Sequence, residues 1–166
     1  MNALTLNIDK RLMPALNNVS DPEIPVLTVL DMGVVRSANF EEGIAIIKIT
    51  PTYSGCPAMD VIASDIKKAL AEEGYRAKVE LVLSPAWTTD WITEKGRQAL
   101  AEYGIAPPLN ATADKGALLG NEKLVKCTNC GSKNTSVVSQ FGSTPCKALF
   151  QCNNCKEPFD YFKCLK

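Results

Sequence analysis

Two CxxC pairs near the end of the chain constrain its fold more than any other feature. Cys127 and Cys130 form the first pair, and Cys152 and Cys155 form the second. A CxxC turn brings both sulfurs to one side, so two such turns can supply the four donors of a tetrahedral metal ion. The chain contains no histidine, which excludes mixed Cys/His sites and catalysis by a histidine base. The four cysteines are therefore predicted to share one metal ion.

The residues around these pairs predict an antiparallel zinc ribbon. Strands are expected at 134–141 and 146–151, joined by a Gly-Ser-Thr-Pro turn, and a third strand is expected at 158–163. All-sulfur ligation suits zinc or an iron–sulfur centre on chemical grounds, but the spacing and the hairpin pattern favour zinc. A segment of this length cannot bury a self-sufficient core, so the metal is expected to contribute folding energy.

Cys146 and Cys164 are thiols that the four-ligand site does not need. Cys146 precedes Cys152 by an even number of residues, so both would face the same side of an unbroken strand. Cys164 ends the last predicted strand and is expected to lie beside Cys146. Three interpretations stay open: small buried apolar side chains, a second soft-metal site, or a thiol pair that meets a client protein.

The rest of the chain predicts a small two-layer domain and therefore an α+β protein overall. The expected order is a helix at 8–19, a hairpin of strands at 32–38 and 43–50, a helix at 57–73, a strand at 76–83 and a helix at 92–103. Pro, Gly, Ala and Asn without periodicity then indicate a linker. We expect domains at 1–103 and 123–166, joined by a linker at 104–122.

Cys56 is the cysteine of the front domain, and it immediately precedes the helix that begins at Pro57. Helix amides and the helix dipole are expected to lower the pKa of its thiol and to favour the thiolate. A cysteine that merely fills the turn is the alternative interpretation. Asp21, Glu23 and Asp31 lie in a proline-rich loop, and composition alone does not make them ligands.

Charge and hydropathy indicate a cytoplasmic protein with no membrane or nucleic-acid partner. No apolar run approaches the roughly 20 residues that span a bilayer, and the N-terminus lacks the pattern of a secretory signal. In a reducing cytosol, clustered cysteines are better interpreted as metal ligands than as disulfides. Residues 123–166 contain seven lysines and two acidic residues within a chain of zero net charge. Metal-bound thiolates would reduce this excess to roughly +3, which is a weak basis for nucleic-acid binding.

Longer stretches of the sequence resemble known families. VSDPEIPVLTVLDMGVV (19–35) and TPTYSGCPAMDVI (50–62) resemble the small domain of cytosolic iron–sulfur assembly factors and of bacterial SufT-like proteins. SPAWTTDWITEKGRQALAEYGIAPP (84–108) and the cysteine pattern of 127–164 add a resemblance to the PaaD family, the accessory subunits of bacterial phenylacetyl-CoA epoxidase systems. Together these segments cover nearly the whole chain.

This resemblance implies a role in aerobic phenylacetate degradation, beside an oxygenase whose other components carry the reaction. Those components are a di-iron catalytic subunit and a reductase with flavin and an iron–sulfur centre, and either is a candidate client. The PaaD-like subunit is expected to assist metal-centre assembly and not to be an enzyme itself. Cys56 corresponds to the assembly-factor cysteine, and Asp21, Glu23 and Asp31 fall in the acidic loop. These residues are candidate ligands for a transient iron ion or iron–sulfur cluster.

Other functions are also open to a chain of this kind. A non-catalytic structural adaptor within the oxygenase complex is the main alternative, in which all cysteines are structural. A thiol redox enzyme would need a resolving thiol close to Cys56, and no CxxC pair lies in the front domain. The oligomeric state is left open.

Overall fold

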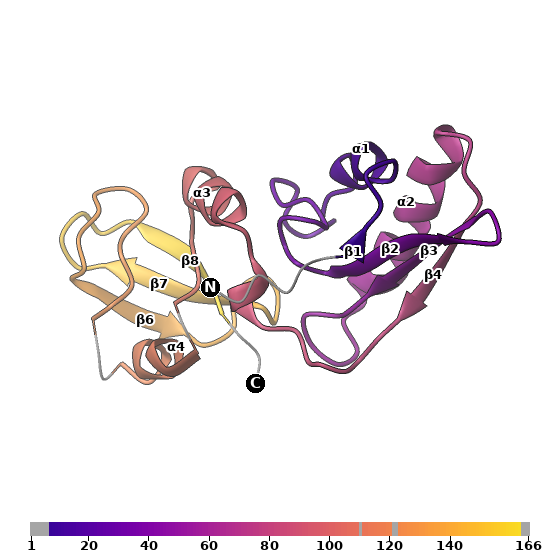
Figure 1. The fold of residues 1–166 in the computed structure, drawn as a ribbon. Coiled ribbons are helices and arrows are strands. Elements are labelled where there is room, and N and C mark those ends of the chain that lie inside the picture. Colours follow the sequence, from indigo (N-terminus) through magenta and orange to yellow (C-terminus); the bar gives the residue numbers. More distant parts are fainter. Residues whose placement is uncertain (1–6, 110, 121–122, 164–166) are drawn as a thin grey trace. The chain divides into compact units, whose positions relative to one another are not determined.

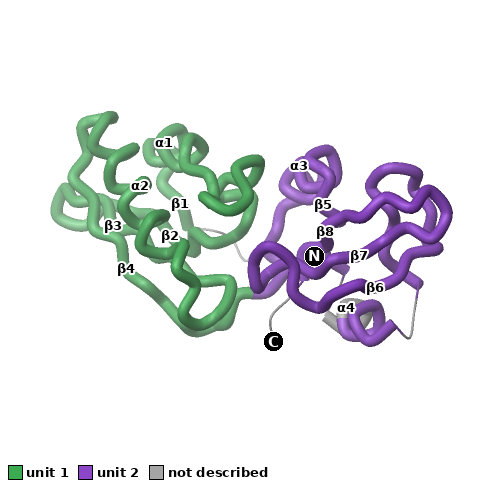
Figure 2. The backbone as a smooth tube through the Cα atoms, turned by 180° about the vertical axis from the view of Figure 1, so that it is seen from behind, with its two compact units in different colours: residues 1–87 green, residues 88–166 purple. Residues whose placement is uncertain are grey.

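The structure is a computed structural model that describes residues 7–109, 111–120 and 123–163. The chain divides into two compact units, residues 1–87 and residues 88–166, shown in green and purple in Figure 2. Each unit has its own four-stranded sheet. No helix in the described part of the chain is long and apolar enough to cross a membrane.

Unit 1 is a mixed sheet with two helices (Figure 1). Its elements are β1 (Asn7–Ile8), α1 (Met13–Asn17), β2 (Val35–Glu41), β3 (Ile44–Ile49), α2 (Ala58–Glu72) and β4 (Ala77–Leu81). The strand order is β1-β2-β3-β4. β2 and β3 are antiparallel, whereas β1 runs parallel to β2 and β4 runs parallel to β3.

The β2–β3 hairpin confirms the prediction from its turn residues. Glu42 and Gly43 both have positive φ angles, 50° and 80°, as a two-residue turn that follows the twist of its strands requires. Ala45, Ile47 and Ile49 of β3 are buried on one face of the sheet. The predicted central position of this apolar strand is therefore confirmed.

α2 also matches its prediction, and its apolar stripe supplies much of the core of unit 1. Its buried residues recur at helical spacing and are Ala58, Met59, Ile62, Ile66 and Leu70. The helix contacts α1 and β4. The helix connects two parallel neighbours, β3 and β4. Its first turn therefore lies beside the carboxyl-terminal ends of both strands.

The first helix is much shorter than predicted. The apolar spacing predicts a helix over 8–19, but α1 covers only Met13–Asn17, and Ile8 instead pairs with Ala38 in β1. Pro14 explains the late start, since proline lacks the N–H of the helix interior and suits the first turn.

Unit 2 contains the predicted ribbon within a larger structure. Its elements are a short 3-10 helix (Thr89–Trp91), α3 (Glu94–Tyr103), β5 (Ile105–Ala106), α4 (Ala111–Leu118), β6 (Thr135–Ser139), β7 (Lys147–Cys152) and β8 (Pro158–Phe162). The strand order is β5-β8-β7-β6. β6, β7 and β8 are antiparallel as predicted, and β5 adds a parallel strand at the edge beside β8.

The predicted domain boundaries differ from the division seen in the structure. α3, predicted within the front domain, belongs to unit 2, and the predicted linker at 104–122 contains β5 and α4. Ile105 and Ala106 are buried because they extend the sheet beside β8. Ala117 of α4 is packed in the core of unit 2 with Phe150 and Tyr161. Such short segments are stabilised by residues far away in the chain. They are also too short to show a periodic pattern of apolar residues from which an element could be predicted.

Candidate metal centre

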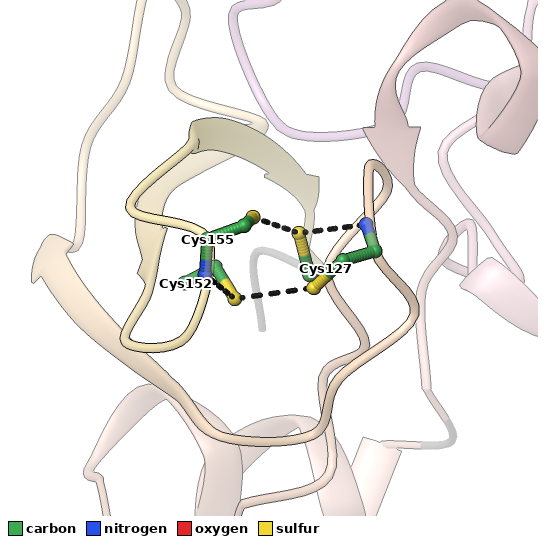
Figure 3. A group of neighbouring side chains, drawn as sticks. Cys127, Cys152 and Cys155 are labelled. Atoms are coloured by element: carbon green, nitrogen blue, oxygen red, sulfur yellow. Dashed lines mark hydrogen bonds between the residues drawn. The ribbon is translucent and has the colours of Figure 1, made fainter.

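Unit 2 brings the four predicted ligand sulfurs together. The Sγ atoms of Cys127, Cys130, Cys152 and Cys155 all lie within 4.8 Å of one another. The sulfurs of Cys127 and Cys155 are 3.6 Å apart (Figure 3), and those of Cys130 and Cys152 are 3.5 Å apart. Four sulfurs about 2.3 Å from a tetrahedral zinc ion would be separated by about 3.8 Å. The sulfur arrangement therefore fits one zinc ion.

The two CxxC turns have matching backbone geometry. In the first turn the Gly131 amide donates to the Cys127 carbonyl at 3.0 Å, and in the second the Lys156 amide donates to the Cys152 carbonyl at 3.0 Å. Gly131 has φ of 73° and Lys156 has φ of 65°. A left-handed conformation costs a lysine roughly 1–2 kcal/mol. The second turn nevertheless adopts this conformation, so the two CxxC turns share the same backbone geometry.

Backbone amides point at the sulfurs and favour their charged form. The Cys130 amide donates to the Cys127 sulfur at 3.5 Å, and the Cys155 amide donates to the Cys152 sulfur at 3.5 Å. Hydrogen bonds from the Glu157 amide and the Asn129 side chain lower the pKa of Cys155 to about 6. The thiolate is the form that binds metal. Although the Ser132 amide opposes the shift, the neighbouring sulfurs raise the pKa of Cys130 to about 11, so a metal ion must displace the proton of that thiol before it binds.

Burial separates the four cysteines into two pairs. Cys127 and Cys152 are buried, whereas Cys130 and Cys155 are exposed. Each turn therefore contributes one sulfur from the core side and one from the solvent side. A metal ion at this position would join the core of unit 2 to its surface.

Cys146 does not belong to this cluster. It is buried just before β7, whose last residue is Cys152, so the two thiols lie at opposite ends of one strand. The Thr144 hydroxyl lies 3.0 Å from the Cys146 sulfur, and the Cys146 carbonyl accepts from the Lys163 amide at 2.9 Å. Cys164 lies outside the described residues, so its position beside Cys146 stays a prediction.

Cys56 lies in unit 1, in the loop that connects β3 to α2. The thiol is half-buried. Its carbonyl accepts from the Met59 amide at 3.3 Å, which fixes the loop against the first turn of α2. Burial raises the pKa of the Cys56 thiol, and the Ala58 amide and the Thr52 hydroxyl offset this only in part. The expected lowering of this pKa by the helix end was therefore wrong, because desolvation outweighs the nearby donors.

The three acidic candidates have different surroundings. The buried Asp21 carboxylate accepts from the amides of Glu23 and Ile24 at 2.7 and 2.9 Å, so it holds the turn of its own loop. The Asp31 carboxylate accepts from the Thr28 hydroxyl at 3.0 Å. Glu23 is half-buried, and its negative charge contributes to the raised pKa of Cys56. Glu23 is thus the acidic candidate whose charge reaches the thiol.

These front-domain residues do not form a ready-made metal cluster. Within residues 7–109, 111–120 and 123–163, only the four cysteines of unit 2 place three or more potential ligand atoms together. A metal ion bound at Cys56 would need further ligands, either from side chains that move toward it or from another molecule. The role of Cys56, Asp21, Glu23 and Asp31 as ligands remains a prediction.

Comparison with known proteins matches each half of the chain to a protein family. Residues 111–163 match the PaaD zinc beta ribbon domain family, and residues 9–81 match the family described as iron-sulfur cluster assembly protein. An Escherichia coli protein named as a component of a 1,2-phenylacetyl-CoA epoxidase is 48% identical over 151 residues, which cover 90% of this chain and 89% of that protein. The chain belongs to the PaaD family. The predicted zinc ribbon and the predicted resemblance are confirmed.

Two further relatives resemble the front half of this PaaD-family chain. The Bacillus subtilis Fe-S protein maturation auxiliary factor YitW is 34% identical over 96 residues, covering 56% of this chain and 93% of that protein. A crystal structure of a domain of unknown function, DUF59, from Bacillus anthracis is 30% identical with a TM-score of 0.51. It covers 54% of this chain and 88% of that one. These likenesses confirm the predicted assembly-factor-like fold.

Sequence reasoning missed the polar side chains that connect the two CxxC turns of the PaaD ribbon. Asn134 donates to the Asn154 side chain at 2.9 Å, and Asn154 donates to the Ser132 hydroxyl at 2.9 Å. Asn153 donates to the Ser136 hydroxyl at 2.8 Å. The adjacent asparagines at 153 and 154 are a signal for a turn. Their partners across the sheet can be found only from the strand register.

Proposed function

We propose that this protein is an accessory factor that assists metal-centre assembly in the phenylacetyl-CoA epoxidase system and does not catalyse the oxygenation itself. The main support for this proposal is that one chain contains both an iron–sulfur-assembly-type unit and a PaaD zinc ribbon. An iron–sulfur-assembly-type unit presents a half-buried cysteine at the start of a helix, and a PaaD zinc ribbon follows it. The Bacillus subtilis relative named as a maturation auxiliary factor supports the assembly role.

In the ribbon, Cys127, Cys130, Cys152 and Cys155 would hold a structural zinc ion. The zinc supplies a tetrahedral crosslink between the two CxxC turns and contributes folding energy to unit 2. The amides that point at the sulfurs orient the thiolates, as hydrogen-bonding partners commonly do around metal ligands. The folded ribbon then offers the surface that recognises a client protein.

In unit 1, Cys56 would act as a transient ligand for the cargo, an iron ion or an iron–sulfur cluster. Because burial raises the pKa of this thiol, a metal ion must displace a proton before it binds. A single cysteine with no preformed ligand cluster around it in the described residues holds metal weakly. Weak retention suits a protein that must release its cargo to a client.

The clients we propose are the di-iron catalytic subunit and the reductase that carries flavin and an iron–sulfur centre. Their metal content distinguishes them, because acid-labile sulfide is present in an iron–sulfur centre and absent from a di-iron carboxylate centre. A co-expression experiment can therefore identify which client depends on this protein.

The test compares Cys56→Ala with the matched control Ser54→Ala, which changes an exposed side chain of the same loop. Each variant is co-expressed with each client, and the iron and sulfide content of the purified client is measured. We expect Cys56→Ala to reduce client loading severalfold and Ser54→Ala to leave it unchanged. The zinc content of the PaaD-family protein should be the same in both variants.

A structural adaptor is the alternative function, and the raised pKa of Cys56 favours it because a protonated thiol is a poor ligand. It predicts that Cys56→Ala leaves client loading and complex formation intact. Unchanged iron content in both clients would therefore reject the transfer role and retain the adaptor.

A further inference from the structure

β4 forms an open edge of the sheet in unit 1. It pairs with β3 on one side, and no strand among the described residues pairs with its other side (Figure 1). The Arg76 carbonyl accepts from Ala45 and the Val82 amide donates to Ile49, so even-numbered residues direct their backbone groups toward β3. Backbone groups alternate along a strand. The amides and carbonyls of Ala77, Val79 and Leu81 therefore point outward.

This edge has little of the usual protection against pairing with another strand. Natural edges are blunted by bulges, prolines, shortness or charged side chains, lysine above all. β4 has five residues without a proline, and it pairs with β3 without a register shift. Its lysine, Lys78, is neutralised by Glu80, whose carboxylate lies 2.8 Å from the ammonium group. By contrast, β1 at the opposite edge has only two residues.

The side chains of β4 differ between its two faces. Lys78 and Glu80 share one face with the exposed Lys48 of β3. Ala77, Val79 and Leu81 share the other face with buried β3 residues, since paired residues of neighbouring strands point the same way. Leu81 nonetheless remains 56% exposed at the end of the strand. An apolar side chain at an open edge gains from a partner that covers it.

We propose that β4 pairs with β4 of a second copy of this chain, antiparallel about a two-fold axis at Val79. The outward backbone groups of Val79 then bond to Val79 of the partner subunit, and those of Ala77 bond to Leu81 of the partner subunit. The two four-stranded sheets become one continuous sheet across an isologous interface. Each exposed Leu81 is flanked by a strand instead of by water.

Charge complementarity selects this register. With the axis at Val79, Lys78 lies opposite Glu80 of the partner subunit, and Glu80 lies opposite Lys78 of the partner subunit. An axis at Lys78 would place two lysines against each other, and an axis at Glu80 would place two glutamates against each other. Directly opposed like charges destabilise a strand pair, whereas opposite charges stabilise it. The strand is therefore complementary to its own antiparallel copy.

Light scattering coupled to size-exclusion chromatography of the full zinc-loaded chain tests the proposal. We expect the wild-type mass to approach twice the 18.0 kDa of one chain as concentration rises. Lys78→Glu alone places two glutamates opposite each other at both 78–80 contacts between the subunits. Glu80→Lys alone places two lysines opposite each other at the same contacts. Each should raise the dimer dissociation constant about tenfold. The double variant Lys78→Glu/Glu80→Lys should restore the dimer.

Mixing the two single variants gives the sharpest result. In a mixed pair every glutamate of one chain faces a lysine of the other, so the mixture should dimerise at concentrations where neither component does alone. Lys67→Glu, an exposed change on α2, is the matched control and should dimerise like the wild type. Val79→Pro removes an outward-pointing amide, and edge strands tolerate a proline at such a position. This variant should be folded by circular dichroism and monomeric by light scattering.

Three outcomes would overturn the proposal. A wild-type protein that stays monomeric at all concentrations shows that β4 does not pair with itself. A dimer that survives both single variants uses another surface. A mixture of the single variants that stays monomeric shows that charge does not set the register.

Discussion

Cys56 owes its chemical character to burial more than to its place before a helix. Its thiol is half-buried, and desolvation raises its pKa above the ordinary value of a cysteine. A raised pKa means that the folded protein holds this proton more tightly than the unfolded chain does. The associated stabilisation is present at low and neutral pH and is lost as the pH rises through the folded-state pKa.

The reactivity of Cys56 should therefore keep rising with pH beyond the point at which the reactivity of a free thiol levels off. We expect the rate of alkylation by iodoacetamide to rise about tenfold per pH unit up to an inflection above that of free cysteine, because only the thiolate reacts. Mass spectrometry of the peptide that contains Cys56 measures this rate in the zinc-loaded protein. The same peptide in urea-unfolded protein is the control. An inflection at or below the unfolded value would contradict the burial argument.

Among single residues, the four ribbon cysteines are the ones whose grouping the sequence predicts best. The CxxC spacing itself brings the two sulfurs of each pair to one side of a turn. The sequence predicts Cys56 only in part. The sequence shows that Pro57 begins a helix, but burial of the preceding thiol depends on how the loop packs. The Asn134–Asn154 contact could not be predicted at all, since it joins residues brought together only by the sheet.

α3 is an element with a capping residue at each end. The Thr93 hydroxyl accepts from the Gly96 amide at 3.0 Å and caps the first turn. Gly104 ends the helix with a φ of 92°, in the left-handed conformation that glycine adopts without strain. Gly104 predicts where this helix ends, whereas the Thr93 cap is known only from the structure, and neither residue assigns the helix to unit 2.

Thr93→Ala should lower the free energy of unfolding of unit 2 by about 1 kcal/mol, because an amide of the first turn loses its partner. Urea unfolding followed by circular dichroism measures the change. Thr93→Ser keeps the hydroxyl acceptor and should cost only a small fraction of that amount. Equal losses in the two variants would show that the threonine methyl group, and not the cap, stabilises the helix.

Elements of two residues are the ones that sequence reasoning misses. β1 and β5 each have two residues, which is too few for a period to be visible. A longer element such as α2 shows a complete apolar stripe, and its bounds follow from the sequence to within a residue or so. The predicted linker at 104–122 contains β5 and α4, which sequence reasoning missed because distant parts of the chain determine their structure.

At the scale of the whole molecule, the two units should differ in their dependence on metal. Each unit has a buried core of its own, and unit 2 has in addition the four-cysteine cluster between its CxxC turns. Zinc that binds only the folded state stabilises that state by mass action.

Removal of zinc by a strong chelator should therefore unfold unit 2 and leave unit 1 folded. Differential scanning calorimetry is expected to show two transitions in the zinc-loaded protein and only that of unit 1 after chelation. Re-addition of zinc should restore the second transition. Simultaneous loss of both transitions would show that the units do not unfold independently.

The pairing of β5 with β8 also sets the order in which the chain can fold as it is made. All strands of unit 1 have been synthesised once Leu81 is in place, so this unit can fold while translation continues. β5, in contrast, has to wait for β8, whose first residue follows it by some fifty positions. Cys127 and Cys130 likewise emerge before the second CxxC turn exists. Zinc capture and closure of the second sheet are thus late events of synthesis, and the Cys56 loop can form before either of them.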